Sequence, residues 1–222
     1  MTQSTKDLVH LAHLLKAPRI GAMAETMAER ARVEAWSYEE YLAAVLEAEA
    51  AARSASGAEG RIKGAGFPAR KTIDAFDFVR QPALRAQIAA LKGSDYLERG
   101  ANVVLLGPPG VGKTHLAIGL GIAAAQAGHR VLFGSATEWV SRLAEAHATG
   151  RLPAELARLR RYRLLVIDEV GYLPFEREAA NLFFQLVSSR YEHASVILTS
   201  NLPFSRWGEV FSDQVVAAVL LG

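Results

Sequence analysis

The feature that most constrains this chain is a glycine-rich octapeptide, G-P-P-G-V-G-K-T, at residues 107–114. The residues before it, 102–106, form a short apolar run with two valines, which predicts a buried strand. After it, residues 115–126 are small and apolar, which predicts a helix that ends near Gly128. The octapeptide therefore has the strand–loop–helix context in which the pattern G-x-x-x-x-G-K-[ST] is a phosphate-binding loop.

This loop has the chemistry to hold the phosphates of a nucleotide. Glycines let the backbone wrap closely around an anion, and the N–H groups at the start of a helix attract phosphate. Lys113 supplies charge for the β- and γ-phosphates, and the Thr114 hydroxyl suits Mg²⁺. We therefore expect ATP and Mg²⁺ as cofactors, with the nucleotide held by Gly107, Pro108, Pro109, Gly110, Val111, Gly112, Lys113, Thr114 and His115.

An acidic pair ends a later apolar run. Residues 164–169, L-L-V-I-D-E, predict a buried strand that carries Asp168 and Glu169 at its carboxyl end. In an open parallel sheet, ligands bind at that edge. We expect Asp168 to orient Mg²⁺ together with Thr114, and Glu169 to act as a base or to orient the attacking water.

A polar residue follows the next predicted strand, which covers residues 195–199. Asn201 stands where it could hold the attacking water or contact the γ-phosphate, although it could also be a turn residue before Pro203. With this assignment the expected catalytic residues are Glu169, Asn201 and Lys113, and the expected metal-binding residues are Thr114 and Asp168.

The order of predicted elements points to an α/β protein. Four strands, 102–106, 130–134, 164–169 and 195–199, alternate with helices, among them one capped by Thr137 and one over residues 176–190. This alternation predicts right-handed crossovers and a mainly parallel sheet with helices on both faces. Aromatic Phe76 and Phe78 precede the first strand, where they could pack near an adenine or belong to the core.

The first third of the chain differs from the rest. Residues 1–53 show apolar stripes at helical spacing, with a capping box at Ser37 and Glu40, and predict a small helical domain that contacts DNA or a protein partner. Residues 54–72 are rich in glycine, serine and basic side chains, and predict a flexible linker that either touches DNA phosphates or is simply solvated. The remaining residues, 73–222, form the predicted ATPase core.

Composition sets broad limits. The 222 residues include no cysteine, which excludes disulfides and thiolate metal sites. The formal net charge of +2 and the sequence pI of about 9.0 are compatible with nucleic-acid binding. Five arginines within residues 151–163 form either a charged helix face or a surface for DNA or another subunit. No signal-peptide pattern or membrane-length apolar run is seen, so we expect a cytoplasmic protein without membrane contact.

Three longer motifs together resemble a known family. The segments G-P-P-G-V-G-K-T-H-L-A, I-D-E-V-G-Y-L-P and T-S-N-L-P-F-S-R-W-G-E-V-F are similar to those of the IstB helper ATPases of insertion-sequence transposition. The helicase loader DnaC belongs to the same AAA+ group. The resemblance spans nearly the whole chain, including the segment G-F-P-A-R-K-T-I-D-A-F-D-F ahead of the core.

This resemblance implies an AAA+ P-loop fold with strand order 5-1-4-3-2. It implies a homo-oligomer that assembles on double-stranded DNA with ATP and that recruits or stimulates a transposase. By match to the family motifs, Asp168 is the Walker B aspartate, Glu169 the catalytic glutamate and Asn201 the first sensor, while Lys113 and Thr114 bind phosphate and Mg²⁺.

The chain departs from the family at its end, V-V-A-A-V-L-L-G. The family continues with an arginine that reaches a neighbouring subunit's ATP, a fifth strand and a second sensor arginine. We therefore expect a C-terminally truncated core that lacks strand five and the lid, with the first strand at the sheet edge. Nucleotide binding should persist, whereas loss of such an arginine can lower turnover by about 10³- to 10⁵-fold.

Three functions remain open, of which the third belongs to a different class from the first two. The first is an ATP-driven transposition helper, which the G-Y-L-P and W-G-E-V-F segments favour. The second is a DnaC-like replicative helicase loader of the same fold. The third is a truncated fragment that binds nucleotide without hydrolysing it. A small-molecule kinase ranks behind these three, since the chain shows no motif for binding a phosphate acceptor.

Overall fold

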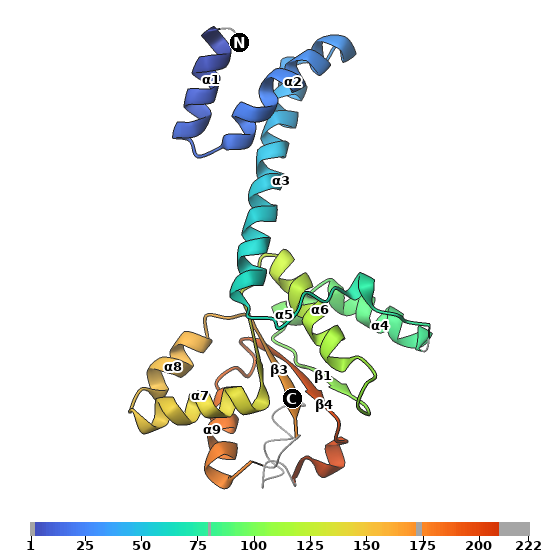
Figure 1. The fold of residues 1–222 in the computed structure, drawn as a ribbon, viewed down its shortest axis with the longest axis vertical. Coiled ribbons are helices and arrows are strands. Elements are labelled where there is room, and N and C mark those ends of the chain that lie inside the picture. Colours follow the sequence, from blue (N-terminus) through green and yellow to red (C-terminus); the bar gives the residue numbers. More distant parts are fainter. Residues whose placement is uncertain (1–2, 80, 172–174, 209–222) are drawn as a thin grey trace. The chain divides into compact units, whose positions relative to one another are not determined.

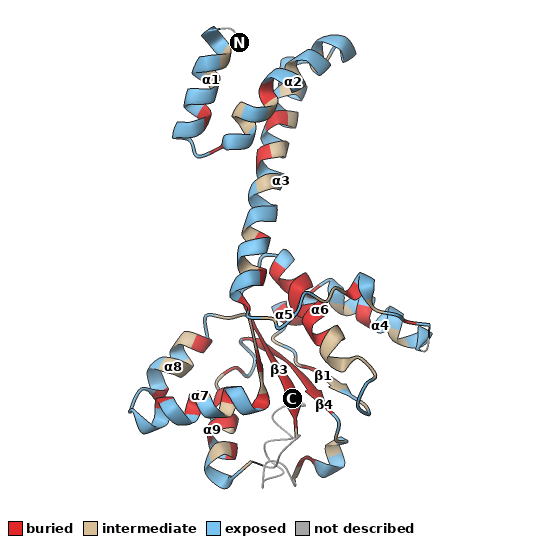
Figure 2. Cartoon of the chain, in the orientation of Figure 1, coloured by how far each residue is buried: buried red, intermediate tan, exposed pale blue. Residues whose placement is uncertain are grey.

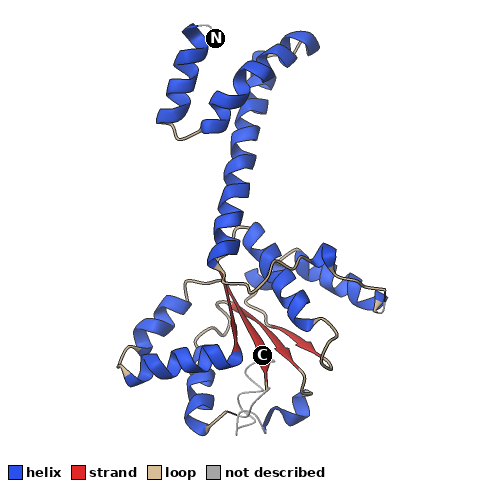
Figure 3. Cartoon of the chain, viewed as in Figure 1, coloured by secondary structure: helices blue, strands red, loops and turns tan. Residues whose placement is uncertain are grey.

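The computed structural model describes residues 3–79, 81–171 and 175–208. The chain divides into two compact units, Met1–Glu59 and Gly60–Gly222. The helices and strands of both units appear in Figure 3.

The first unit is formed by α1 (Gln3–Leu14), α2 (Pro18–Glu34) and the greater part of α3 (Tyr38–Gly64). Pro18 at the first position of α2 suits a helix start, where no N–H partner is needed. The capping box predicted before α3 is confirmed, because Ser37 Oγ accepts from the Glu40 N–H and the Glu40 carboxylate accepts from the Ser37 N–H.

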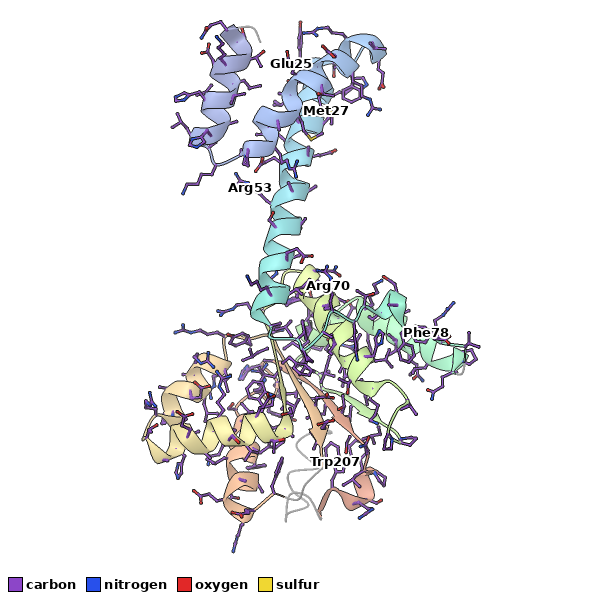
Figure 4. The ribbon with its side chains drawn as sticks, viewed as in Figure 1. Glu25, Met27, Arg53, Arg70, Phe78 and Trp207 are labelled. Carbon is purple, nitrogen blue, oxygen red and sulfur yellow. The ribbon has the colours of Figure 1, made fainter. Side chains whose placement is uncertain are left out.

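A buried carboxylate joins two helices of this unit. Glu49 is only 6% exposed, and its carboxylate accepts hydrogen bonds from the Arg53 Nε at 2.6 Å and from the Arg19 backbone N–H at 2.9 Å. Arg53 also donates to the carbonyls of Leu15 and Lys16, so its side chain, seen in Figure 4, reaches the α1–α2 turn. The hydrogen bond from Arg53 lowers the pKa of Glu49.

The prediction of a flexible linker over residues 54–72 is wrong for its first half, because α3 runs without interruption to Gly64. Ser and Gly residues there lower helix propensity, but packing outweighs propensity. Ile62 and Ala65 are buried in the core of the second unit, and Arg61 Nε donates to the Ala125 carbonyl at 2.7 Å. Anchored at this point, the basic segment is helical where a loop was expected.

The second unit is built on a parallel four-stranded sheet among the described residues. Its strands are β1 (Val103–Leu106), β2 (Val131–Ser135), β3 (Leu164–Val170) and β4 (Ser195–Ser200), in the order β1-β4-β3-β2. This order agrees with the one that the family resemblance implies for strands one to four. Within the described residues β1 pairs only with β4, while our expectations for the last residues, 209–222, lie outside the described part of the chain.

Helices cover both faces of the sheet and create two apolar layers (Figure 1). On one face lie α4 (Pro82–Lys92), α5 (Asp95–Glu98) and α6 (Lys113–Gln126), and on the other α7 (Ala136–Ala148), α8 (Leu152–Leu159) and α9 (Arg177–Ser188). Alternate residues of β3 divide between these layers, as its period of two requires. The two central strands, β3 and β4, are correspondingly buried along most of their length (Figure 2), whereas β1 and β2 are only partly buried. The predicted α/β/α architecture is confirmed.

The start of α7 differs from the prediction. Ser135, rather than Thr137, is the N-cap, because its hydroxyl accepts from the Glu138 N–H and Glu138 Oε2 accepts from the Ser135 N–H. Glu138 lies three residues after Ser135, which completes a capping box that a Thr137 cap would not have offered.

A buried arginine ties the amino ends of two strands together. Arg190 is 1% exposed and donates to the carbonyls of Leu159, Tyr162 and Ser195. Burial lowers its pKa to about 10, which still leaves the guanidinium charged at neutral pH. These bonds fix the α8–β3 connection and the start of β4 at the sheet edge opposite the glycine loop.

Candidate ATP-binding site

The residues singled out by sequence converge at the carboxyl edge of the sheet. The glycine loop connects β1 to α6, with Gly110 at φ +79° and Gly112 at φ +90°, conformations that favour glycine. The Gly107 N–H donates to the Ser200 carbonyl at 3.3 Å, which ties the start of the loop to the end of β4. Backbone N–H groups at the start of the buried helix α6 thus lie within the loop that is expected to hold phosphate.

Lys113 is held by three acceptors. Its Nζ donates to the carbonyls of Gly107 and Pro108, each at 2.8 Å, and to the Oδ1 of Asn201 at 2.6 Å. An ammonium group has three N–H donors, so these three bonds use them all. Burial lowers the pKa of Lys113, and the nearby Asp168 carboxylate partly opposes that effect. The predicted catalytic pair of Lys113 and Asn201 is therefore in direct contact.

The two predicted metal-binding residues are also in contact. Thr114 Oγ1 donates to the Asp168 Oδ1 at 3.0 Å, across 54 residues of sequence. Asp168 is 7% exposed at the end of β3, and Thr114 is the second residue of α6. A hydroxyl beside a single carboxylate fits Mg²⁺, which is commonly held by one or two carboxylates together with substrate phosphates. Within the described residues no group of three or more histidine, cysteine, aspartate or glutamate side chains is arranged to hold a metal ion.

Glu169 has an unusual backbone at a break in the sheet. Its φ is +60°, a conformation that non-glycine residues seldom adopt, and its side chain is exposed. The register of β3 on β4 passes from Ile167↔Leu198 to Val170↔Ser200, so two residues of β3 face the single residue Thr199. This is a β-bulge, a feature that re-aims side chains and is often found next to active sites.

The segment after β4 positions Asn201 with bonds of its own. Ser200 Oγ donates to the Val170 carbonyl at 2.6 Å and accepts from the Leu202 N–H at 3.0 Å. Trp207, which follows the short helix η2 (Phe204–Arg206), is fully buried, and its Nε1 donates to the Leu202 carbonyl. Figure 4 shows this tryptophan below the end of β4. The loop that carries Asn201 is therefore anchored on both sides.

His115 lies beside the glycine loop, but its side chain is bound elsewhere. Its Nε2 lies 2.8 Å from the Thr72 carbonyl, and its ring packs edge-on against Phe76. Phe76 in turn packs so closely on Gly112 that a Cβ there would lie 2.5 Å from its Cε2. Phe76 supports the start of α6, which accounts for one of the two aromatic residues noted in the sequence.

A cavity of about 450 Å³ adjoins the loop, between α4 and β1. Apolar side chains of α4 and β1 line most of it, the loop residues Gly107, Pro108 and Lys113 line one end, and Gln81 and Gln87 add amide groups. Its position beside the phosphate loop gives room for the remainder of a nucleotide, with apolar walls that suit a base.

Sequence reasoning missed Thr199 and Trp207 as parts of the site. Thr199 read as the last residue of an apolar strand, although a hydroxyl at the carboxyl edge of a sheet is a signal that could have singled it out. Trp207 acts through Leu202, a contact that no local pattern reveals. All nine loop residues, Asp168, Glu169 and Asn201 lie at one edge, as predicted.

The fold and this site define a P-loop nucleotide-binding protein. A family model described as IstB-like ATP binding protein matches residues 10–222. The chain belongs to this IstB-like family.

Sequence relatives agree with the family match. The ATP-binding protein of insertion sequence IS21 from Pseudomonas aeruginosa is 45% identical over 216 residues, covering 97% of this chain and 82% of the relative. The ATP-binding protein of insertion sequence IS5376 from Geobacillus stearothermophilus is 39% identical over 218 residues, covering 97% and 87%. The chain is therefore similar over nearly its whole length to ATP-binding proteins of insertion sequences.

Solved structures support the fold. The replication initiator DnaA bound to AMPPCP and single-stranded DNA aligns with a TM-score of 0.61 at 22% identity, covering 69% of this chain and 48% of that chain. The DnaC helicase loader aligns with a TM-score of 0.60 at 20% identity, covering 68% and 91%. At this identity the likeness concerns the fold alone. In the described part of this chain, no helix is both long and apolar enough to cross a membrane.

Proposed function

We propose that this protein is an ATP-hydrolysing helper of DNA transposition, which assembles on double-stranded DNA as a homo-oligomer and stimulates or recruits a transposase. The observation that carries the proposal is the contact network of Lys113, Thr114, Asp168 and Asn201 in a member of the IstB-like family. A protein with this function would work in the cytoplasm, where DNA and ATP are both available.

Nucleotide binding would begin at the glycine loop. Its N–H groups and the start of α6 would hold the phosphates, and Lys113 would exchange bonds to loop carbonyls for bonds to phosphate oxygens. A bound Mg²⁺ would neutralise phosphate charge, with Thr114 and Asp168 as the residues that hold it. The base would occupy the cavity beside β1.

Hydrolysis would depend on the residues at the ends of β3 and β4. The exposed Glu169 carboxylate would orient or deprotonate the attacking water. Asn201, already bonded to Lys113, would contact the γ-phosphate or the water. The bulge matters here, because it turns Glu169 out of the buried sheet while its neighbour Asp168 stays buried.

Exposed arginines near α8 are the proposed contact with DNA. Of the five predicted from the sequence, Arg158 is paired with Glu155 and Arg163 donates to the carbonyls of His193 and Glu98. Arg151 is exposed and donates to Thr149 Oγ1 at 3.0 Å, whereas the exposed Arg160 and Arg161 are the arginines proposed to contact phosphates. The helical unit, residues 3–59 as described, is the proposed contact for the transposase or for further DNA.

The transposition role has more support than the helicase-loader role. The relatives at 39% and 45% identity are named as ATP-binding proteins of insertion sequences. The likeness to the DnaC loader, at 20% identity, concerns the fold. The proposal that nucleotide is bound without turnover becomes one outcome of the experiment below.

The test is ATP turnover by the full chain, with and without double-stranded DNA, together with a direct ATP-binding measurement. The proposal expects ATP binding and DNA-stimulated release of phosphate, which Glu169→Gln should abolish without loss of binding. Binding without turnover would overturn the hydrolytic part of the proposal, and lack of ATP binding would overturn it altogether. A transposition assay with an insertion-sequence transposase, run with and without this protein, tests the helper role.

The DNA surface has its own test. Replacing both Arg160 and Arg161 with alanine should weaken DNA binding and reduce the slope of log affinity against log salt by about 2, since each phosphate contact adds about 0.9. Arg163→Ala, a change at an arginine bound to carbonyls, is the matched control and should leave that slope unchanged. Equal slopes for the double variant and the original protein would exclude this surface.

A further inference from the structure

Thr199 stands at the point where β3 bulges away from β4, and its hydroxyl has two partners. Oγ1 accepts a hydrogen bond from the Glu169 N–H at 2.9 Å and donates one to the Asp168 Oδ1 at 2.5 Å. Thr199 is 1% exposed and Asp168 is 7% exposed, so the bond between them lies in a buried setting, where a hydrogen bond is electrostatically stronger than in water.

The bulge explains why this hydroxyl is needed. Two residues of β3, Asp168 and Glu169, face one residue of β4, so the regular ladder has one strand residue too many at this position. The Thr199 side chain supplies the acceptor for the Glu169 N–H in place of a strand carbonyl. A hydroxyl can do this and still donate its own proton to a carboxylate, whereas an apolar side chain of the same shape can do neither.

We propose that Thr199 is the positioning residue that sets the Asp168 carboxylate and the Glu169 backbone relative to each other. One side chain then controls two chemical roles, the orientation of Mg²⁺ and the orientation of the attacking water. The inference rests on the proposed function for its kinetic consequences. Its structural content, the link between two adjacent acidic residues through one hydroxyl, is a property of the protein alone.

Two threonine hydroxyls, those of Thr114 and Thr199, bind the same carboxylate oxygen of Asp168, and they differ in their expected roles. Thr114 Oγ1 and Thr199 Oγ1 both donate to the Asp168 Oδ1, at 3.0 and 2.5 Å. Thr114 is the residue expected to turn its hydroxyl to Mg²⁺, because it lies in the phosphate loop. Thr199 would then keep the carboxylate in place on its own. Asp168 would therefore lose the hydrogen bond from Thr114 when Mg²⁺ binds and keep the one from Thr199.

The strained backbone of Glu169 bears on the second part of the proposed role of Thr199, which is to hold that backbone in place. A non-glycine residue at φ +60° persists only when its surroundings hold it there. The bond from its N–H to Thr199 is one such restraint, and the Ser200–Val170 bond at 2.6 Å closes the other side of the bulge. Without the Thr199 hydroxyl, the Glu169 backbone is free to relax toward an ordinary strand, which would re-aim its carboxylate.

The test compares Thr199→Val with Thr199→Ser in the full chain. Valine keeps the shape and removes the hydroxyl, whereas serine keeps the hydroxyl. We expect valine to lower kcat by about 10- to 100-fold, the usual effect of losing a residue that orients a metal ligand, and to raise the Mg²⁺ concentration needed for half-maximal turnover. ATP affinity should change by less than about threefold, and serine should restore most of the rate.

A matched control is Thr149→Val, which removes a hydroxyl that caps α7 far along the chain from the site. It should leave kcat and the Mg²⁺ dependence unchanged even where it lowers the melting temperature. If Thr199→Val also keeps the original kcat and Mg²⁺ dependence, or if serine fails to restore them, Thr199 is not a positioning residue.

A second measurement needs no nucleotide and separates this inference from the proposed function. Amide hydrogen exchange at Glu169, followed by NMR on the full chain, should be slow in the original protein and at least about tenfold faster in Thr199→Val, with serine close to the original. Unchanged exchange would overturn the inference even if the protein hydrolyses ATP. Faster exchange in a protein that binds no ATP would support the structural link while refuting the ATPase proposal.

Discussion

Lys113 and Asn201 are joined by a hydrogen bond of 2.6 Å between Nζ and Oδ1, although 88 residues of sequence separate them. A phosphate that approaches Lys113 therefore competes with Asn201 for the ammonium group. Replacing Asn201 with alanine removes this competitor and also removes the proposed contact with the γ-phosphate. These two effects on ATP affinity oppose each other, so the affinity should stay within about threefold of the original. Turnover should fall by about 100-fold, the scale for removing one group that stabilises a transition state. Calorimetric ATP binding and phosphate release measure the two effects.

A second substitution tests the contact between Lys113 and Asn201 by adding a negative charge. Asn201→Asp places a carboxylate beside Lys113, where it pairs with the ammonium group and repels phosphate. ATP affinity should fall by about tenfold, the factor that about 1.4 kcal/mol of added repulsion produces. An aspartate variant that binds ATP as tightly as the alanine variant would show that the contact with Lys113 has no part in nucleotide binding.

The glycine loop contains two glycines of similar backbone conformation and different surroundings. A Cβ at Gly112 would lie 2.5 Å from Phe76, while one at Gly110 would meet nothing within 4 Å. Gly110→Ala should cost about 1 to 2 kcal/mol from its left-handed backbone alone. Gly112→Ala should cost about 1 to 3 kcal/mol more from overpacking, measured by urea denaturation. Adding Phe76→Leu should relieve part of that excess in the Gly112 variant only.

Glu169 combines a strained backbone with an exposed carboxylate, so its two properties can be separated. Glu169→Gln should keep ATP binding and lower turnover by about 10²- to 10⁴-fold. Glu169→Gly should lose turnover to the same extent, yet it should be more stable than Glu169→Ala by about 1 kcal/mol, because glycine adopts φ +60° without penalty. Equal stability of the glycine and alanine variants would argue against strain at this residue.

The stability of the helical unit should depend on pH through Glu49. The hydrogen bond from Arg53 lowers the pKa of Glu49 below its ordinary value of 4.5. A carboxylate with a lowered pKa contributes stability above its unfolded pKa and loses that contribution as the pH falls through the folded value. Urea denaturation followed by circular dichroism should therefore show a loss of stability in acid that is smaller in Glu49→Gln. Glu47→Gln, a change at an exposed carboxylate of the same helix, should retain the full loss.

The sequence predicted the site better than it predicted the connection ahead of it. Loop, acidic pair and sensor residue each lie next to a strand in the sequence, and parallel strands bring their carboxyl ends to one edge. That rule alone was enough to place Lys113, Asp168 and Asn201 together. The strand order followed from the family resemblance and agrees with the observed sheet.

The features that the sequence left out depend on contacts distant in the chain. The last turn of α3 is held within the second unit by Arg61 and Ile62, and local composition cannot report such packing. The bulge at Glu169 arises from the register of β3 on β4, which propensity does not set. The sequence could have placed the Thr199 hydroxyl at the carboxyl edge of the sheet, but its two partners, the Glu169 N–H and the Asp168 carboxylate, follow from that register and are seen only with the strands in place.

Arg190 binds at the amino ends of β3 and β4, and the candidate site lies at the opposite, carboxyl ends. Its three bonds to the carbonyls of Leu159, Tyr162 and Ser195 hold the amino ends of β3 and β4. β3 and β4 are therefore held at their amino ends, whereas the residues of the site lie at their carboxyl ends. Asp168, Glu169 and Asn201 lie at the carboxyl edge. Small displacements there would bend the strands without shifting their amino ends. The sheet is thus a support for the site that is fixed at the edge away from it.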